Sequence, residues 1–145
     1  MKFVLFVEGY TEQKAVPGFF KRWLDPQLTQ RVGIQAVRFE GWNEFIKKID
    51  NKARMHLEGP GGANIIAAIG LMDLYGPTFF PDHLSSAQER LAWAVNDIEK
   101  KVNHPKFRMF FAVHELEAWI LSQPQLLPST VRNALPGKVA LPESN

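Results

Sequence analysis

The sequence predicts an α/β fold: a single domain with a four-stranded, mostly parallel sheet and helices on both faces. Apolar segments alternate along the chain with segments whose apolar residues recur at helical spacing, in the order β-α-β-α-β-α-β-α. The apolar segments are continuous, which is typical of parallel strands that are covered on both faces. The chain has 145 residues, a length that suits one domain with its own core.

The first predicted strand covers residues 2–7, and a helix follows it. Thr11 is a suitable N-cap residue for that helix, because its hydroxyl can accept a hydrogen bond from a free backbone N–H. Apolar residues then recur at helical spacing as far as Leu24. Pro17 lies inside this run, which predicts a late start or a kink. The Asp-Pro pair that begins at Asp25 predicts the end of the helix.

The later elements follow the same alternation. Strands are expected over residues 32–39, 65–72 and 107–113, and helices over residues 42–55, over residues 86–101 and from residue 114 to the stop at Pro124. Ser86 and Glu89 have the spacing of a capping box at the start of a helix. We therefore divide the chain into an α/β domain over residues 1–123 and a proline-rich tail over residues 124–145.

Composition and charge exclude several classes of protein. The chain has no cysteine, which excludes disulfides, thiolate zinc sites and cysteine nucleophiles. The apolar run near the N-terminus is too short for a signal peptide, and no segment reaches the roughly 18 apolar residues of a membrane span. We expect a cytoplasmic protein without membrane contact. The formal net charge of +2 permits nucleic-acid binding without indicating it.

Acidic residues follow three of the four predicted strands. Glu8 follows the first strand, Asp73 the third, and Glu115 and Glu117 the fourth. The carboxyl ends of parallel strands lie on one edge of the sheet, where α/β proteins place their ligands. Carboxylates that gather there repel one another unless a cation neutralises them, and oxygen ligands suit Mg²⁺ or Mn²⁺. The pattern predicts a metal site, with Glu8 as a ligand or a general base.

A structural interpretation of each residue stays open beside the functional one. A polar residue commonly marks the point where a strand leaves the core, and the acids after the fourth strand could instead complement the positive end of a helix. His114 lies three residues before Glu117, so the two could share one helix face and one ligand. The aromatic residues Tyr75, Phe79 and Phe80 could stack on a base or cover an edge of the core.

Three motifs resemble those of Toprim domains. VEGYTE at residues 7–12 is similar to the first Toprim motif, in which a glutamate ends the first strand. MDLYG at residues 72–76 lies where these domains carry an Asp-x-Asp pair. HELEAWI at residues 114–120 is similar to a motif of a bacterial Toprim-like family, the domain of unknown function 4276. The resemblance implies a compact α/β fold with a divalent-metal site that acts on phosphodiester bonds of nucleic acid.

The resemblance also implies roles for individual residues. Glu8 matches the general acid or base, and Asp73 matches the first metal-binding aspartate. The second aspartate of the pair falls on Tyr75, a poor ligand for Mg²⁺. The family motif suggests that Glu115 or Glu117 replaces it. Some proteins of this kind resemble partners of ATPases in phage defence, and similar proteins continue with basic, helical sequence where this chain stops, so we expect a shortened tail.

Three hypotheses about function follow. The first is a Toprim-like nuclease that uses Mg²⁺ or Mn²⁺ to cleave phosphodiester bonds. The second is a module of the same fold whose catalytic site has decayed at Tyr75, and which binds a partner ATPase or nucleic acid through Trp42, Phe79 and Phe80 as exposed aromatic residues. The third is a metal-dependent phosphatase acting on a small molecule, for which a deep closed pocket, rather than an open acidic edge, would be the cue.

Overall fold

The centre of the structure is a parallel sheet. The computed structural model describes residues 1–113, 122–126, 129 and 133. Its strands are β1 (Lys2–Val7), β2 (Gly33–Arg38), β3 (Ile65–Asp73) and β4 (Phe107–Ala112). They lie in the order β2-β1-β3-β4, and each neighbouring pair is parallel. The predicted α/β class and four-stranded sheet are confirmed.

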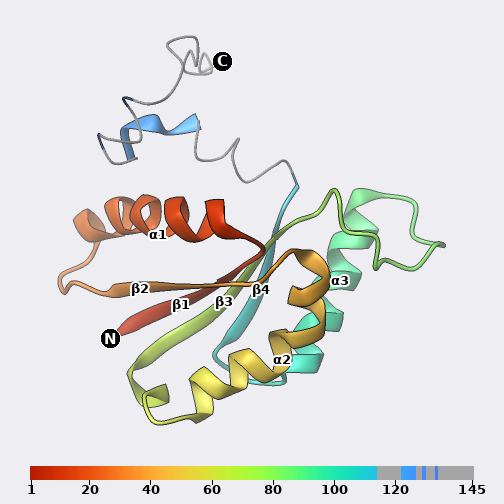
Figure 1. Cartoon of the computed structure of the whole chain (residues 1–145), viewed down its shortest axis with the longest axis horizontal. Helices are drawn as coiled ribbons and strands as arrows, with labels where there is room; N and C mark the ends of the chain where they lie inside the picture. Colours follow the sequence, from red (N-terminus) through yellow and green to blue (C-terminus); the bar gives the residue numbers. More distant parts are fainter. Residues whose placement is uncertain (114–121, 127–128, 130–132, 134–145) are drawn as a thin grey trace.

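Helices cover both faces of the sheet. The long helices are α1 (Tyr10–Leu24), α2 (Trp42–Glu58) and α3 (Ala87–Val102), and short 3₁₀ helices cover Asp25–Gln27, Gly62–Asn64 and Pro124–Leu126. Figure 1 shows α1 on one face and α2 and α3 together on the other. None of the helices in the described part of the chain is long and apolar enough to cross a membrane.

The prediction that Thr11 caps the first helix is wrong. The helix begins at Tyr10, and the N-cap position is occupied by Gly9, without a side-chain hydrogen bond to the cap. The chain leaves β1 in an extended conformation at Gly9 and turns into the helix at once, and Gln13 N donates to Gly9 O at 3.1 Å. The helix therefore starts well ahead of Pro17, which lies in its interior.

The capping box at the start of α3 is present, in a modified form. Ser86 Oγ accepts a hydrogen bond from Glu89 N at 3.1 Å. The carboxylate of Glu89 accepts from the backbone N–H of Ser85 rather than from that of Ser86, at 3.4 Å. At the other end of the helix, Asn103 adopts a left-handed conformation with φ of 50° and donates to Glu99 O, which ends the helix as a C-cap.

The face of the sheet under α2 and α3 carries the main core, which we call the closed face. Alternate residues of each strand point into it, and its largest fully buried side chains include Phe6, Phe45 and Phe107. From the helices come Ile49, Ala53 and Leu57 of α2, and Ala94, Ile98 and Val102 of α3. Burial of this continuous apolar surface provides most of the stability that the fold needs.

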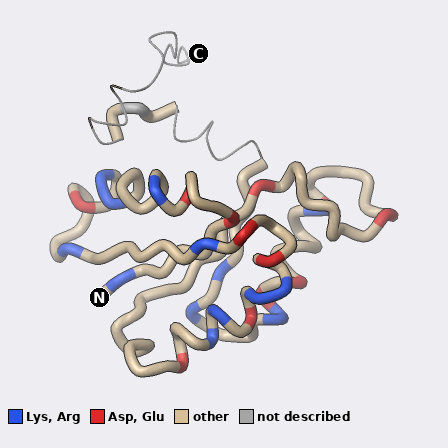
Figure 2. The backbone as a smooth tube through the Cα atoms, viewed as in Figure 1, with Lys and Arg blue, Asp and Glu red and all other residues tan. Residues whose placement is uncertain are grey.

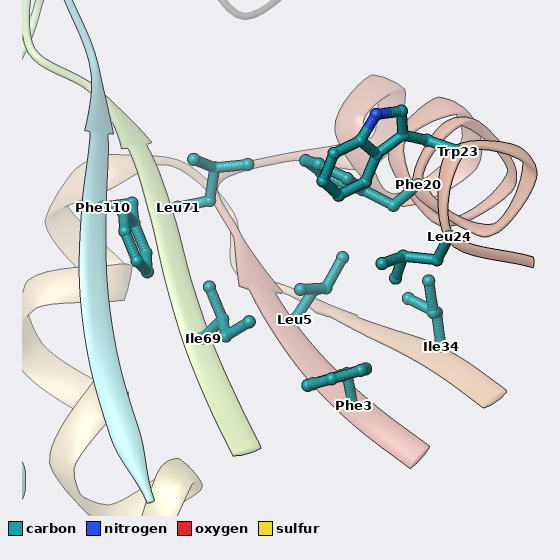
Figure 3. Close-up of a pocket in the computed structure, with 9 residues that line it drawn as sticks. All are labelled: Phe3, Leu5, Phe20, Trp23, Leu24, Ile34, Ile69, Leu71 and Phe110. Atoms are coloured by element: carbon teal, nitrogen blue, oxygen red, sulfur yellow. The ribbon is translucent and has the colours of Figure 1, made fainter. Parts of the chain in front are cut away.

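The face under α1, which we call the open face, is only partly covered. Leu5, Val7, Val16, Leu71 and Ala112 form a smaller buried cluster there. Beside it lies an open groove of about 470 Å³, shown in Figure 3, between α1 and the strands. Its lining is apolar throughout: Phe3, Leu5, Phe20, Trp23, Leu24, Ile34, Ile69, Leu71 and Phe110.

Candidate functional site

The candidate site lies at the carboxyl ends of β1 and β3, the two central strands. The connection from β1 leads outward to β2, whereas the connection from β3 leads outward to β4 on the opposite side. Such a reversal opens a crevice at the carboxyl ends of the two strands, and ligands of open α/β sheets bind in this crevice. Glu8 directly follows β1, and Asp73 is the last residue of β3. The topology alone therefore brings these two acids to the ligand-binding position of the fold.

A short hydrogen bond joins the two acidic residues. The backbone N–H of Asp73 donates to Glu8 Oε1, with an N–O distance of 2.7 Å. A hydrogen bond from a backbone amide to a carboxylate is charge-assisted, so it fixes the direction in which the carboxylate points. The Glu8 side chain therefore points from the end of β1 toward the end of β3, where Asp73 lies.

The backbone of Glu8 is held from the other side by the start of α2. Gly41 N donates to Glu8 O at 2.8 Å, and Phe39 N donates to Val7 O at 3.0 Å. Gly41 has φ of 99°, a left-handed backbone conformation that residues other than glycine rarely adopt. This glycine turn lets the chain leave β2, close against Glu8 and begin α2 in succession.

The fourth strand adjoins the same site. Ala112 of β4 pairs with Asp73, and Leu74 N donates to Ala112 O at 2.9 Å, so the ladder continues past Asp73. Three of the predicted site residues come next in the sequence: His114, Glu115 and Glu117. They lie outside the described residues, and their predicted roles stay predictions.

The described residues supply two carboxylates for a divalent cation. Within residues 1–113 and the few described positions beyond, no group of three or more His, Asp or Glu side chains could hold a metal ion. Mg²⁺ commonly binds through one or two carboxylates and completes its octahedron with water and substrate phosphate oxygens. Glu8 and Asp73 therefore fit this ion chemically, and a ligand from residues 114–117 would add to them.

Tyr75 occupies the position where a second aspartate was expected. Its side chain is 58% exposed, and it precedes Gly76, which has φ of 106°. The chain turns away from the sheet at this point, so Tyr75 lies on the surface beside the strand end. The phenol of Tyr75 is better suited to stacking on a bound molecule than to coordinating Mg²⁺.

The structure corrects the interpretation of Trp42, Phe79 and Phe80 as exposed partner-binding residues. All three are partly buried and pack against the core of the closed face. The ring centroids of Phe79 and Phe80 are 4.4 Å apart, and Phe79 also stacks on Trp42 at 6.1 Å and packs against Trp93 at 5.7 Å. This cluster anchors the long loop after β3 onto α2 and α3, which is the structural alternative left open by the sequence.

Sequence analysis missed an exposed cluster of cations and an aromatic ring beside the site. Tyr10 is 56% exposed. Lys14 Nζ lies 5.0 Å and Arg38 Cζ 5.3 Å from its ring centroid. The signal in the sequence was weak: Tyr10 and Lys14 are four residues apart at the start of a helix, but only the strand register adds Arg38. Figure 2 shows acidic and basic positions close together where the strands end near the start of α1.

The apolar groove on the open face does not belong to this site. Its lining comes from the starts and middles of the strands and from the later turns of α1, and it includes neither Glu8 nor Asp73. Among the residues that the structure describes, no polar side chain that could bind a phosphate ester lines it. The groove is also open on one side, so it is not the deep closed pocket that the phosphatase hypothesis requires.

Comparison with known proteins gives one family and one similar structure. A family model described as "Domain of unknown function (DUF4276)" matches residues 7–145. The C-terminal region of the OLD protein of Xanthomonas campestris pv. campestris is similar, with 21% sequence identity and a TM-score of 0.41. The similarity covers 85% of this chain and 56% of that one, so this chain spans just over half of that structure. No curated protein matches the chain.

Proposed function

The chain belongs to the family described as domain of unknown function 4276, and from this premise we propose that it is a Toprim-like domain that cleaves phosphodiester bonds of nucleic acid with a divalent metal ion. The observation that carries the proposal is the pairing of Glu8 and Asp73, joined by the 2.7 Å hydrogen bond at the switch point of the sheet. This bond fixes the Glu8 carboxylate next to the residue that we assign to the metal, so a proton-transferring group and a metal ligand lie side by side.

Each acid has a separate task in the proposed reaction. Asp73, with Glu115 or Glu117, holds Mg²⁺ or Mn²⁺ near the scissile phosphate. The bound ion supplies neutralisation of phosphate charge and a lower pKa for an attacking water. Glu8 would take a proton from the attacking nucleophile or return one to the leaving oxygen, and the Asp73 amide already fixes the direction of its carboxylate.

Cleavage of a labelled oligonucleotide in Mn²⁺ or Mg²⁺ tests the proposal. We expect Glu8→Gln to lower the cleavage rate by at least about 100-fold, since a positioned acid or base contributes roughly 10²–10⁴. Glu58→Gln, at the exposed end of α2 far from the switch point, is the matched control and should keep the wild-type rate. Equal rates for Glu8→Gln and wild type, with circular dichroism showing both folded, would exclude the assigned role of Glu8.

A second candidate is a binding module of the same fold without catalysis. Tyr75 favours this candidate, because this exposed residue lies at the position of the second metal-binding aspartate of Toprim domains. Its partner would be an ATPase of a phage-defence system or a nucleic acid. This candidate predicts that the wild-type chain shows no metal-dependent cleavage and that Glu8→Gln changes nothing, so the same assay separates the two functions.

A further inference from the structure

Tyr10, Lys14 and Arg38 form a compact surface cluster, which we call the Tyr10 cluster. Tyr10 is the first residue of α1, Lys14 lies one helical turn further along, and Arg38 is the last residue of β2. The two cationic groups lie 5.0 Å and 5.3 Å from the centroid of the Tyr10 ring. An exposed aromatic ring thus gathers two positive charges from two different elements of the fold.

The cluster lies close to Glu8 in the fold. Arg38 is in register with Val7, the residue before Glu8, and neighbouring strands are about 4.8 Å apart. Tyr10 follows Glu8 by two residues along the chain. A phosphodiester positioned at Glu8 and Asp73 would therefore have its adjoining nucleotides within reach of the cluster on the β2 side of the site.

Two cations elsewhere in the described part of the fold are used differently. Arg54 donates to Val102 O at 2.9 Å and to Lys101 O at 2.7 Å, so it caps the last turn of α3. Lys106 donates to Ile65 O at 2.8 Å at the start of β3. These side chains donate hydrogen bonds to backbone carbonyls, and a ligand would have to break those bonds to bind them.

The contacts of the Tyr10 cluster are of a weaker kind. Cation–π contacts at exposed sites contribute little, and the ion pair of Arg38 with Glu40 is long, at 3.7 Å, with the Glu40 side chain 75% exposed. A phosphate group could replace such contacts at small cost, because it offers a charge-assisted and bidentate bond to a guanidinium. The ring face that a cation leaves would then be open to a base.

We propose that the Tyr10 cluster binds a single strand of nucleic acid next to the phosphodiester held at Glu8 and Asp73. Arg38 and Lys14 contact its phosphates, and the ring of Tyr10 stacks on one base. A single strand fits because its bases present free faces, which a duplex hides within its own stack. The inference rests on the proposed function and adds to it the substrate class and the residues that select it.

Fluorescence anisotropy with a labelled single-stranded oligothymidine tests the assignment in EDTA, where metal chemistry plays no part. Tyr10→Ala and Arg38→Ala should each weaken binding by at least about fivefold, and Arg38→Ala should also lower the slope of log K against log salt by about 0.7. Tyr10→Phe should bind like wild type, because it keeps the ring. All three side chains of the cluster lie on the surface, so these variants should fold.

Matched controls come from the same chain. Arg31 precedes the opposite end of β2, about 20 Å from Arg38 along the strand, and Lys47 lies on the exposed surface of α2. Arg31→Ala and Lys47→Ala each remove one positive charge, as Arg38→Ala does, and should change binding less than twofold. Losses equal to those of the cluster variants would show that net charge alone governs binding, which contradicts the proposal.

The outcomes separate this inference from the proposed function. Cluster-dependent binding of oligothymidine in EDTA supports the inference even if the wild type cleaves nothing. Metal-dependent cleavage together with equal binding by wild type, Tyr10→Ala and Arg38→Ala overturns the inference and leaves the proposed function standing. Tighter binding of a duplex of the same length than of the single strand, or no binding by the wild type at low salt, also overturns it.

Discussion

The two faces of the sheet are built from the same strands but are covered to very different degrees. On the closed face, Phe107 and Met109 of β4 are 1% and 2% exposed and contact the core that α2 and α3 complete. On the open face, Phe110 of the same strand is 52% exposed and lines the groove beside α1. Figure 1 shows α2 and α3 under one face and α1 over the other.

This difference separates stability from the candidate chemistry. The closed face contains most of the buried apolar surface, so it fixes the strand order and the register that place Glu8 beside Asp73. Neither acid takes part in that core, and both remain only partly covered at the strand ends. We therefore expect substitutions on the closed face to change the free energy of unfolding, and substitutions at the strand ends to change binding and catalysis.

The largest expected effect comes from truncating one aromatic side chain on each face of β4. Phe107→Ala should lower the free energy of unfolding by about 3–5 kcal/mol, because it removes a fully buried ring and leaves a cavity. Phe110→Ala, the matched control on the open face, should lower it by less than about 1 kcal/mol. Chemical denaturation followed by circular dichroism measures both. Similar losses for the two variants would mean that the open face is as well covered as the closed one.

The smallest expected effect is a dependence of stability on pH through His56. Burial lowers the pKa of His56 below its ordinary value of 6.5, and Lys2 and Lys52 lower it further. Its ring packs edge-on against Phe6 of the closed face, with centroids 5.6 Å apart. The unfolded chain therefore binds the proton more readily than the folded chain. The stability that the neutral His56 contributes to the fold is fully present above about pH 6.5 and declines as the pH falls below that value.

Denaturation of wild type and of His56→Gln between pH 7.5 and pH 5 measures this dependence. The wild type should lose a little more stability than the variant over that interval. An identical decline in the stability of the two proteins would show that folding does not lower the pKa of His56.

Much of the fold could be predicted because its signals are local. Continuous apolar runs marked each strand to within a residue or two, and the spacing of Ser86 and Glu89 marked the start of α3. The unequal covering of the two faces could not be predicted in this way. Phe110 belongs to an apolar run that is typical of a strand buried on both faces, and among the described elements α1 lies over β1 and β2 and leaves Phe110 exposed.

The candidate site was predictable in part for the same reason. That strand ends share an edge follows from parallel topology, and Glu8 and Asp73 do lie side by side. The Tyr10 cluster depends on the register that places Arg38 beside Val7, which no local pattern contains. Likewise, whether Phe79 and Phe80 face solvent or the core depends on Trp42 and Trp93, which are distant in sequence.

The most direct test of the central claim is the binding of Mn²⁺ by isothermal titration calorimetry, with wild type, Asp73→Asn and, as a matched control, Asp82→Asn in the exposed loop after β3. We expect the wild type and Asp82→Asn to bind the ion, and Asp73→Asn to fold without binding it. Equal binding by Asp73→Asn and wild type, or no binding by the folded wild type, would contradict the claim that Asp73 belongs to a metal site at the edge of the sheet.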